Sequence, residues 1–427
     1  MSIKEIYEKF LLSSGVITDS RKVCKKSIFI SLKGPNFNGN KFAKTAIENG
    51  ASISIVDEKK YKLNDVNYIY VNDCLKTLQE LANFHRKKLK TKIIALTGSN
   101  GKTTTKELIN SVLKTKYNTS FTTGNLNNHI GVPLSILKIT KKTELAIIEM
   151  GANHIGEIEL LSKIAEPNFG YITNFGKAHI EGFGSKEGVV IGKGELYKFL
   201  KKRGGVIFYN SDDQTQKTLL LDYKNKFGFG KINSDVLYKV NSINPNITIS
   251  SEGFNFQSHL FGNYNVENIL AAITIGLYFE VDKSKIRDGI LNYKPSNNRS
   301  QIIKKIKNDI VLDAYNANPS SMILAIQNFE KLKSDNKILI LGDMFELGKD
   351  QINYHQEIID YCEKMDVKKI YLVGSIFSKT RFSKKFTSFT SCNEVIKSNE
   401  FKNISKSIFF LKGSRGIQLE KLVNYIP

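Results

Sequence analysis

The fold is decided by the stretch Ile93-Ile94-Ala95-Leu96-Thr97-Gly98-Ser99-Asn100-Gly101-Lys102-Thr103-Thr104-Thr105. Apolar and β-branched residues run into a Gly-Ser-Asn-Gly turn, and apolar residues recur with helical spacing after Lys102. This pattern predicts a strand, a tight loop and a helix. Such a loop directs backbone N–H groups and a helix N-terminus towards one point, an arrangement that suits a phosphate chain.

The residue types in this loop indicate a nucleotide site. Lys102 can reach the terminal phosphates, and the Thr103 hydroxyl can bind the magnesium ion that accompanies them. The loop is shorter than a full Walker A motif, whose first glycine would fall on Leu96. The alternative is a glycine-rich turn with a surface lysine, which the flanking strand and helix disfavour. We therefore predict that a nucleotide is bound by Gly98, Ser99, Asn100, Gly101, Lys102, Thr103 and Thr104.

Length and composition exclude several classes of protein. A chain of 427 residues with 41% hydrophobic residues is long enough for more than one packed domain. Its four cysteines are scattered without a C-x-x-C pair, so we expect neither a zinc site nor a disulfide framework. The sequence contains no signal-peptide pattern and no stretch of membrane-spanning length. We expect a soluble cytoplasmic protein without a membrane span.

The formal net charge of +22 raises the possibility of nucleic-acid binding. The lysines are spread along the whole chain, however, often in runs on predicted helix faces such as Arg86-Lys87-Lys88. We interpret these runs as solvated faces and expect no nucleic-acid partner. A basic protein would still attract an anionic substrate that carries a nucleotide.

Three α/β units are predicted, at residues 1–92, 93–300 and 301–427. The first contains short strands and ends in a basic helix over Cys74–Lys88. Its polar, glycine-rich segment 33–40 predicts a surface loop. We expect a hinge between the second and third units near 294–299, because this polar stretch separates two α/β patterns.

The central unit places a carboxylate beside the phosphate loop. Leu145 to Gly151 reads as a buried strand that ends near Glu149. Because a parallel sheet binds ligands at its carboxyl edge, Glu149 is a candidate magnesium ligand, with a surface glutamate as the alternative. A long glycine-rich loop is predicted over 175–184, and it contains His179, which on its own is equally compatible with a solvated side chain.

The third unit alternates strands and helices regularly. Strands are predicted at 310–312, 338–341, 370–373 and 408–411, and helices at 320–332, 354–365, 391–401 and after Gly416. This alternation predicts a Rossmann-like sheet, although no G-x-G-x-x-G follows the first strand. Polar residues gather at three strand ends, in 313–318, 342–348 and 412–415.

Several further motifs occur along the chain in a fixed order. They are Gly124-Asn125-Leu126-Asn127-Asn128, Glu149-Met150-Gly151-Ala152, His179-Ile180-Glu181-Gly182-Phe183-Gly184, Lys193-Gly194-Glu195, Asn263-Tyr264-Asn265-Val266-Glu267-Asn268 and Asp313-Ala314-Tyr315-Asn316-Ala317-Asn318. Together with the phosphate loop they resemble the motifs of the Mur ligases, the ATP-dependent amide-forming enzymes of peptidoglycan precursor synthesis. The resemblance covers nearly the whole chain and the same three-domain layout.

The resemblance implies an activity and a set of ligands. The motifs are most similar to those of family members that join D-alanyl-D-alanine to UDP-N-acetylmuramoyl-tripeptide through an acyl phosphate. It therefore implies these two substrates as partners, ATP as cosubstrate, two magnesium ions and a carbamylated Lys193. We expect the enzyme to act as a monomer.

The resemblance also implies roles for individual residues. Lys102, His179 and Lys193 would be catalytic, and the metal ligands would be Thr103, Glu149, His179 and Lys193. The adenine, phosphate and ribose of the nucleotide would contact Asn268, Arg299 and Asp313. Substrate contacts would come from Ser20, Arg21, Gly39, Asn125, Asn127, Asn128, Asn316, Lys412, Ser414 and Arg415. The chain has Asn38-Gly39-Asn40 where the family usually has Asp-Gly-His.

Two alternative functions follow from the same residues. Within the same class, the chain would use another acid and amine, as other muramoyl ligases and the folylpolyglutamate-type ligases do. In a different class, it would be a P-loop ATPase that nucleic acid stimulates, which only the +22 charge favours. The absence of interleaved basic and aromatic motifs disfavours the second alternative.

Overall fold

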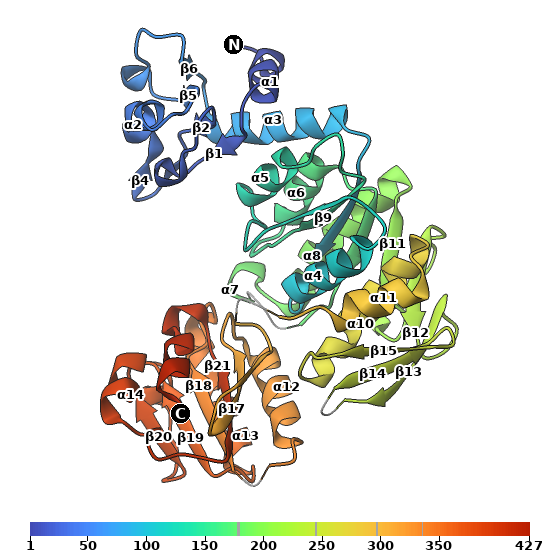
Figure 1. Cartoon of the computed structure of the whole chain (residues 1–427), viewed down its shortest axis with the longest axis vertical. Helices are drawn as coiled ribbons and strands as arrows, with labels where there is room; N and C mark the ends of the chain where they lie inside the picture. Colours follow the sequence, from blue (N-terminus) through green and yellow to red (C-terminus); the bar gives the residue numbers. More distant parts are fainter. Residues whose placement is uncertain (177–179, 244–245, 296–297, 335) are drawn as a thin grey trace.

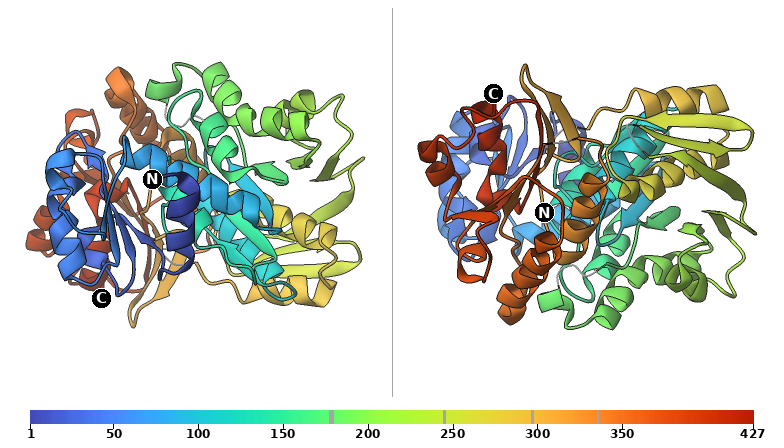
Figure 2. Two further views of the ribbon diagram at one scale, coloured as in Figure 1. Left: turned by 90° about the horizontal axis from the view of Figure 1, so that it is seen from above. Right: turned by 90° about the horizontal axis from the view of Figure 1, so that it is seen from below.

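The chain folds into three α/β domains that follow one another along its longest axis in the computed structural model (Figure 1). The structure describes residues 1–176, 180–243, 246–295, 298–334 and 336–427. Seen from above and below, the N-terminal and C-terminal domains project on the same side of the central domain (Figure 2). The predicted architecture of three α/β domains is confirmed.

The N-terminal domain is built on a four-stranded parallel sheet of order β1-β2-β5-β6. Its strands are β1 (Val16–Ile17), β2 (Ile28–Ile30), β5 (Ile53–Val56) and β6 (Tyr68–Tyr70), and its helices are α1 (Ile3–Leu11), α2 (Ala43–Glu48) and α3 (Cys74–Lys88). Helix α3, which the sequence predicts with the same bounds, begins where the side chain of Asp73 accepts a hydrogen bond from the backbone of Lys76.

The predicted surface loop at residues 33–40 is partly wrong. The segment forms a hairpin, β3 (Lys33–Gly34) and β4 (Phe37–Asn38), and then buries Gly39 and Asn40. The Asn40 side chain donates to Asp57 Oδ1 over 2.8 Å and accepts from the Asp57 backbone over 3.0 Å. A polar side chain is buried here because its hydrogen bonds are satisfied, which composition alone does not reveal.

The central domain contains a nine-stranded sheet of order β15-β14-β13-β12-β11-β10-β7-β9-β8. Its strands are β7 (Lys92–Thr97), β8 (Thr119–Phe121), β9 (Leu145–Glu149), β10 (Phe169–Ile172), β11 (Val206–Asn210), β12 (Lys226–Gly230), β13 (Val236–Ser242), β14 (Ile247–Ser251) and β15 (Phe254–Ser258). The part of the sheet that runs β13-β12-β11-β10-β7-β9-β8 is parallel throughout. Strand β14 pairs antiparallel with both β13 and β15. The sequence pattern did not predict this antiparallel extension.

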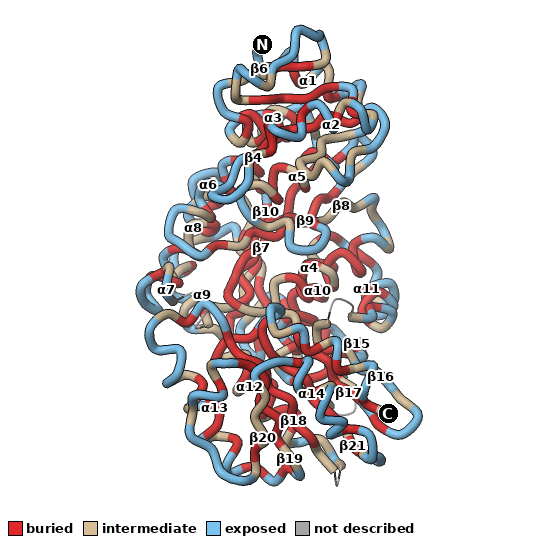
Figure 3. The backbone as a smooth tube through the Cα atoms, turned by 90° about the vertical axis from the view of Figure 1, so that its left-hand side faces the viewer, coloured by how far each residue is buried: buried red, intermediate tan, exposed pale blue. Residues whose placement is uncertain are grey.

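Helices cover both faces of the parallel part of this sheet. They are α4 (Lys102–Leu113), α5 (Gly131–Leu137), α6 (Glu157–Ala165), α7 (Ile180–Phe183), α8 (Lys186–Arg203), α9 (Gln214–Leu219), α10 (Val266–Tyr278) and α11 (Lys283–Leu291). Ile93 and Ala95 face one hydrophobic core and Ile94 and Leu96 face the other, so β7 is buried on both sides (Figure 3). Double burial explains why β7 reads as a continuous apolar run. The sequence predicts a loop over 175–184, whereas the structure contains the short helix α7 within this segment.

The C-terminal domain contains a six-stranded sheet of order β16-β17-β21-β18-β19-β20, in which only the β16–β17 pair is antiparallel among the described strands. Its strands are β16 (Gln301–Lys304), β17 (Asn308–Asp313), β18 (Lys337–Gly342), β19 (Lys369–Val373), β20 (Phe386–Phe389) and β21 (Ser407–Lys412). Its helices are α12 (Pro319–Glu330), α13 (Gln351–Glu363), α14 (Cys392–Ser398) and a final 3-10 helix, η8 (Leu419–Tyr425). The predicted strands and helices of this domain are present, with the last helix of the 3-10 type.

The junction between the N-terminal and central domains depends on Arg86 of α3. Its guanidinium donates to Ala165 O over 2.9 Å, to Thr91 O over 2.9 Å and to Asn168 Oδ1 over 2.9 Å. Arg86 is therefore buried, and the expectation of a solvated face is wrong for this residue. Lys87 and Lys88 beside it are exposed, as predicted.

We expect the substitution Arg86→Ala to lower the free energy of unfolding by ~2–3 kcal/mol, because it leaves buried carbonyl oxygens without donors. Urea titration followed by circular dichroism measures this change. Lys88→Ala on the same helix is the matched control and should change stability little. Equal unfolding midpoints for the two variants would show that the junction does not depend on the Arg86 side chain.

No helix among the described residues combines the length and the apolar character needed to span a membrane.

Candidate active site

The loop between β7 and α4 requires glycine at two positions. Gly98 has φ +140° and Gly101 has φ +79°, both in the region that favours glycine. A Cβ on Gly98 would lie 2.0 Å from Thr173 Oγ1, and one on Gly101 would lie 2.5 Å from Asn268 Oδ1. These glycines allow the loop to pack tightly against β10 and α10, which fixes its backbone at the carboxyl edge of the sheet.

Lys102 folds back over the phosphate loop. Its ammonium group donates to Gly98 O over 2.6 Å and to Ser99 O over 3.1 Å. Burial lowers the pKa of Lys102 to about 8, an effect that the Glu149 carboxylate partly offsets. The loop thus contains a poorly solvated positive charge, and phosphate oxygens would supply the anion that it lacks.

Thr103 and Glu149 meet at the end of adjacent strands. The register of β7 and β9 pairs Leu96 with Glu149, and Glu149 is 1% exposed. Glu149 Oε1 accepts from Thr103 Oγ1 over 3.2 Å and from Asn127 Nδ2 over 2.8 Å. Glu149 Oε2 is buried and has no hydrogen-bond partner within the described part of the chain. A buried carboxylate oxygen without a donor, next to a hydroxyl, fits the hard oxygen ligands that Mg²⁺ prefers.

The described residues contain no group of three or more His, Cys, Asp or Glu side chains that could hold a metal by themselves. A magnesium ion at this position would therefore need ligands from outside that set, such as the Thr103 hydroxyl and phosphate oxygens.

Lys193 of α8 lies fully buried, and its amine donates to Ala152 O over 2.8 Å. The amine also lies 4.8 Å from the centre of the Phe183 ring. Burial, together with the nearby positive charge of Lys102, holds the pKa of Lys193 well below its usual range. Burial therefore favours the uncharged form of the amine, which is the form that reacts with an electrophile. The predicted ligand His179 lies outside the described residues.

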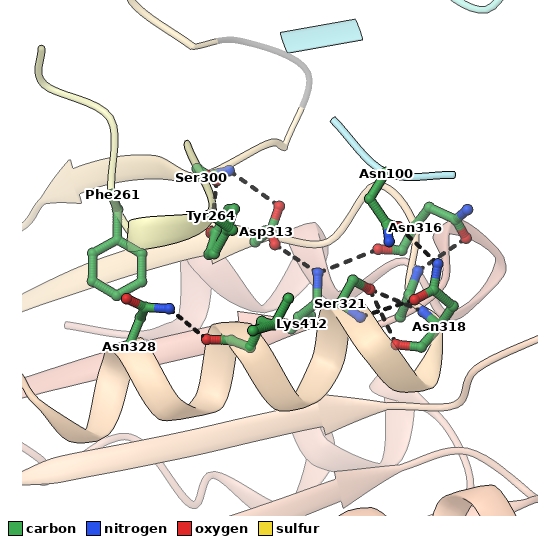
Figure 4. Close-up of polar contacts among 12 residues, drawn as sticks. Asn100, Phe261, Tyr264, Ser300, Asp313, Asn316, Asn318, Ser321, Asn328 and Lys412 are labelled. Carbon is green, nitrogen blue, oxygen red and sulfur yellow. Dashed lines mark hydrogen bonds and ion pairs between the residues drawn. The ribbon is translucent and has the colours of Figure 1, made fainter. Parts of the chain in front are cut away.

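The C-terminal domain contributes a second charged group to the site (Figure 4). Lys412 Nζ lies 2.6 Å from Asp313 Oδ2, and both side chains come from the ends of the neighbouring strands β21 and β17. Asp313 Oδ1 also accepts from the backbone N–H of Ser300 over 3.2 Å. The Arg299 guanidinium lies 3.7 Å from the centre of the Tyr315 ring. Its buried Nε has no hydrogen-bond partner among the described residues.

A cavity of about 1200 Å³ lies between the central and C-terminal domains. It is lined by most of the predicted site residues, namely Ser99, Asn100, Gly101, Lys102, Thr103, Thr104, Asn125, Asn127, Asn128, Glu149, Asn268, Arg299, Asp313, Asn316 and Lys412. Asn268 holds the loop in place, because its Oδ1 accepts from Thr105 Oγ1 over 2.8 Å. The cavity is large enough for a nucleotide and joins the phosphate loop to the polar strand ends of the C-terminal domain.

Other predicted residues lie apart from this cavity. Ser20, Arg21 and Gly39 belong to the N-terminal domain, where Arg21 forms an exposed ion pair with Asp19. Ser414 is buried, and its hydroxyl accepts from the Phe345 backbone over 3.0 Å, so it supports a loop. The Arg415 guanidinium lies 5.2 Å from the centre of the Tyr315 ring, the same ring that Arg299 contacts.

Sequence reasoning assigned no role to Lys106, Asn265 and Asn318. Lys106 is fully buried and its amine lies 3.7 Å from Glu149 Oε2. Asn265 Oδ1 accepts from Asn268 Nδ2 over 2.8 Å, which orients the Asn268 amide. Lys106 follows the phosphate loop by one helical turn, so its spacing from Lys102 and Thr103 is a usable signal. Asn318 also caps α12 locally, but its bond to Asn100 crosses between domains and leaves no local signal in the sequence.

Comparison with known families agrees with this geometry. Three family models match the chain: the Mur ligase family catalytic domain at residues 13–88, the Mur ligase middle domain at 96–276 and the Mur ligase glutamate ligase domain at 298–403. The chain belongs to the Mur ligase family.

Similar relatives share one name within that family. The UDP-N-acetylmuramoyl-tripeptide–D-alanyl-D-alanine ligase of Bacillus subtilis is 35% identical, over 98% of this chain and 93% of its own length. A crystal structure of MurF from Acinetobacter baumannii has a TM-score of 0.85 at 29% identity and covers 96% of this chain and 92% of its own. MurF from Thermotoga maritima, solved in complex with ADP, has a TM-score of 0.85 at 26% identity and covers 97% of each chain.

We expect Glu149→Gln to raise the magnesium concentration needed for half-maximal turnover about 10-fold or more, because the amide keeps the shape but removes the charge. A magnesium titration at saturating ATP measures the effect. Glu144→Gln, an exposed position just before β9, is the control and should leave the titration unchanged. An unaltered magnesium curve in Glu149→Gln would rule out a metal-binding role for this carboxylate.

Proposed function

We propose that this chain is an ATP-dependent ligase that joins D-alanyl-D-alanine to UDP-N-acetylmuramoyl-tripeptide. The products are the UDP-muramoyl-pentapeptide precursor of peptidoglycan, ADP and phosphate. The observation that carries the proposal is the cavity in which Lys102, Thr103 and Glu149 face the Asp313–Lys412 pair. The full-length similarity to ligases of this name supports the choice of substrates.

The reaction proceeds in two transfers. The terminal carboxylate of the tripeptide attacks the γ-phosphorus of ATP, the bond to the β,γ-bridging oxygen breaks, and an acyl phosphate and ADP result. The amine of D-alanyl-D-alanine then attacks the acyl carbon, loses a proton and expels phosphate. Lys102 and the backbone N–H groups of the phosphate loop position the triphosphate and neutralise its charge, which is the main catalytic contribution in phosphoryl transfer.

Thr103 and Glu149 are the residues that would hold a magnesium ion, since they present a hydroxyl and a buried carboxylate oxygen that accepts no hydrogen bond from the described residues. When bound, the ion would neutralise charge on the β- and γ-phosphates. The predicted second ion would use His179, which lies outside the described residues, and Lys193.

We also propose that Lys193 carries a carbamate. Burial favours the uncharged form of this amine, which can attack the carbon of CO₂ and lose a proton, so that the side chain becomes an anionic oxygen ligand. The position of Lys193 against Ala152, directly after the β9 strand end, supports this role.

The domains have separate tasks in this proposal. Residues 1–92 would bind the UDP end of the substrate through Ser20, Arg21 and the segment around Gly39. Residues 93–300 would bind the ATP phosphates, and residues 301–427 would contact the nucleotide and the dipeptide through Asp313, Asn316, Lys412 and Arg415. The C-terminal domain would close over the acyl phosphate, because open water would hydrolyse it.

Phosphate release tests the function directly. We expect ATP-dependent phosphate release with UDP-muramoyl-tripeptide and D-alanyl-D-alanine together, and little without the dipeptide. Lys102→Ala should lower the rate about 100-fold or more, because it removes the charge at the transferred phosphate. Lys114→Ala, exposed at the far end of the same helix, is the control. Phosphate release that responds to other amine acceptors, and not to this dipeptide, would assign the chain to another ligase activity.

Isotopic labelling tests the carbamate. After incubation with ¹³C-bicarbonate, we expect a carbamate carbon signal in the NMR spectrum of the wild-type protein and its loss in Lys193→Met. The exposed Lys198→Met on the same helix should retain the signal. An identical spectrum for Lys193→Met and the wild type would remove Lys193 from the metal ligands.

A further inference from the structure

One side-chain hydrogen bond links the phosphate loop to the C-terminal domain. Asn318 Nδ2 donates to Asn100 Oδ1 over 2.8 Å, and both residues line the cavity (Figure 4). Among the hydrogen bonds of the described residues, no other joins residues 98–104 to the C-terminal domain. A direct bond between a nucleotide-binding loop and a second domain connects ligand occupancy to domain position.

The central domain holds Asn100 rigidly. Its backbone oxygen accepts from Thr173 Oγ1 over 2.6 Å and from Asn174 Nδ2 over 3.1 Å. Its backbone N–H donates to Asn174 Oδ1 over 3.1 Å. The backbone of Asn100 is therefore fixed, and the position of its amide oxygen is set by the position of the phosphate loop.

The C-terminal domain holds Asn318 with similar rigidity. Asn318 is the N-cap of α12, where its Oδ1 accepts from the Ser321 backbone over 2.9 Å. Because the cap uses the oxygen, the nitrogen Nδ2 must face Asn100. Asn318 is 8% exposed, so water competes poorly for the bond between the two amides.

The other end of α12 is attached to the central domain by different contacts. Asn328 Oδ1 accepts from the Asn263 backbone over 2.8 Å. Phe261, from the segment before α10, packs into the C-terminal core, with its ring 6.1 Å from that of Phe410. Helix α12 thus has a hydrogen bond and an apolar contact to the central domain near Asn328, and a single polar bond to the phosphate loop at its other end.

We propose that Asn318 is a positioning residue for ATP, and that its bond to Asn100 fixes the C-terminal wall of the cavity against the phosphate loop. The apolar attachment near Asn328 keeps the domains together, and the Asn318–Asn100 bond selects the orientation that binds the nucleotide. This inference rests on the proposed ligase function. According to this inference, α12 contributes to ATP affinity through the bond from Asn318 to Asn100.

The test variant is Asn318→Ser. Serine retains the N-cap of α12 and adds no charge, but its side chain is too short to replace the amide donor. Loss of one buried hydrogen bond predicts a KM for ATP that is about 3- to 10-fold higher, with the KM for UDP-muramoyl-tripeptide unchanged. The matched control is Asn424→Ser, an exposed asparagine of the same domain.

A double-mutant cycle with Asn100→Ala separates the bond from a general structural effect. If the bond is responsible, Asn318→Ser should raise the KM for ATP in the wild-type background and have little further effect in the Asn100→Ala background. Equal effects in both backgrounds, or an unchanged KM in an active Asn318→Ser enzyme, would overturn the inference and leave the ligase function intact. Absence of ligase activity in the wild type would instead overturn the proposed function.

Discussion

The site depends on the pairing of two parallel strands. Because β7 and β9 are neighbours in register, the phosphate loop after β7 and the carboxylate at the end of β9 meet at one edge of the sheet. The Thr103–Glu149 hydrogen bond is the direct result. Any shift in register would move Glu149 away from the loop, and the buried carboxylate oxygen would then have neither a cation nor a donor.

The two domains that form the cavity contribute different charges to it. On the central side, burial lowers the pKa of both Lys102 and Lys193, and the charge of Lys102 lowers the pKa of Lys193 further. On the C-terminal side, Lys412 is neutralised by Asp313. A triphosphate is a natural counterion for Lys102 and for Arg299, while the strand ends of the C-terminal domain supply neutral amides and an ion pair that is already satisfied. Binding of the nucleotide and approach of the domains therefore favour each other.

The sequence was sufficient for the architecture, and most residues of the predicted nucleotide site line one cavity, since strand-loop-helix patterns and strand ends are local signals. It was not sufficient where burial depends on distant partners. Arg86 reads as a surface residue until its partners Ala165 and Asn168 on the central domain are known. Asn40 reads as a loop residue until Asp57 is placed beside it. Ser414 follows a strand end among polar residues, yet its hydroxyl supports Phe345.

The central claim is that a substrate carboxylate is activated by the ATP held at the mouth of this sheet. It is tested most directly by labelling the terminal carboxylate of UDP-muramoyl-tripeptide with ¹⁸O and analysing the released phosphate by mass spectrometry. An acyl phosphate requires the oxygen that leaves the carboxyl carbon to depart with the phosphate, so the account predicts ¹⁸O in the inorganic phosphate at each turnover. Unlabelled phosphate, with the ¹⁸O that leaves the carboxyl carbon found in water instead, would contradict it.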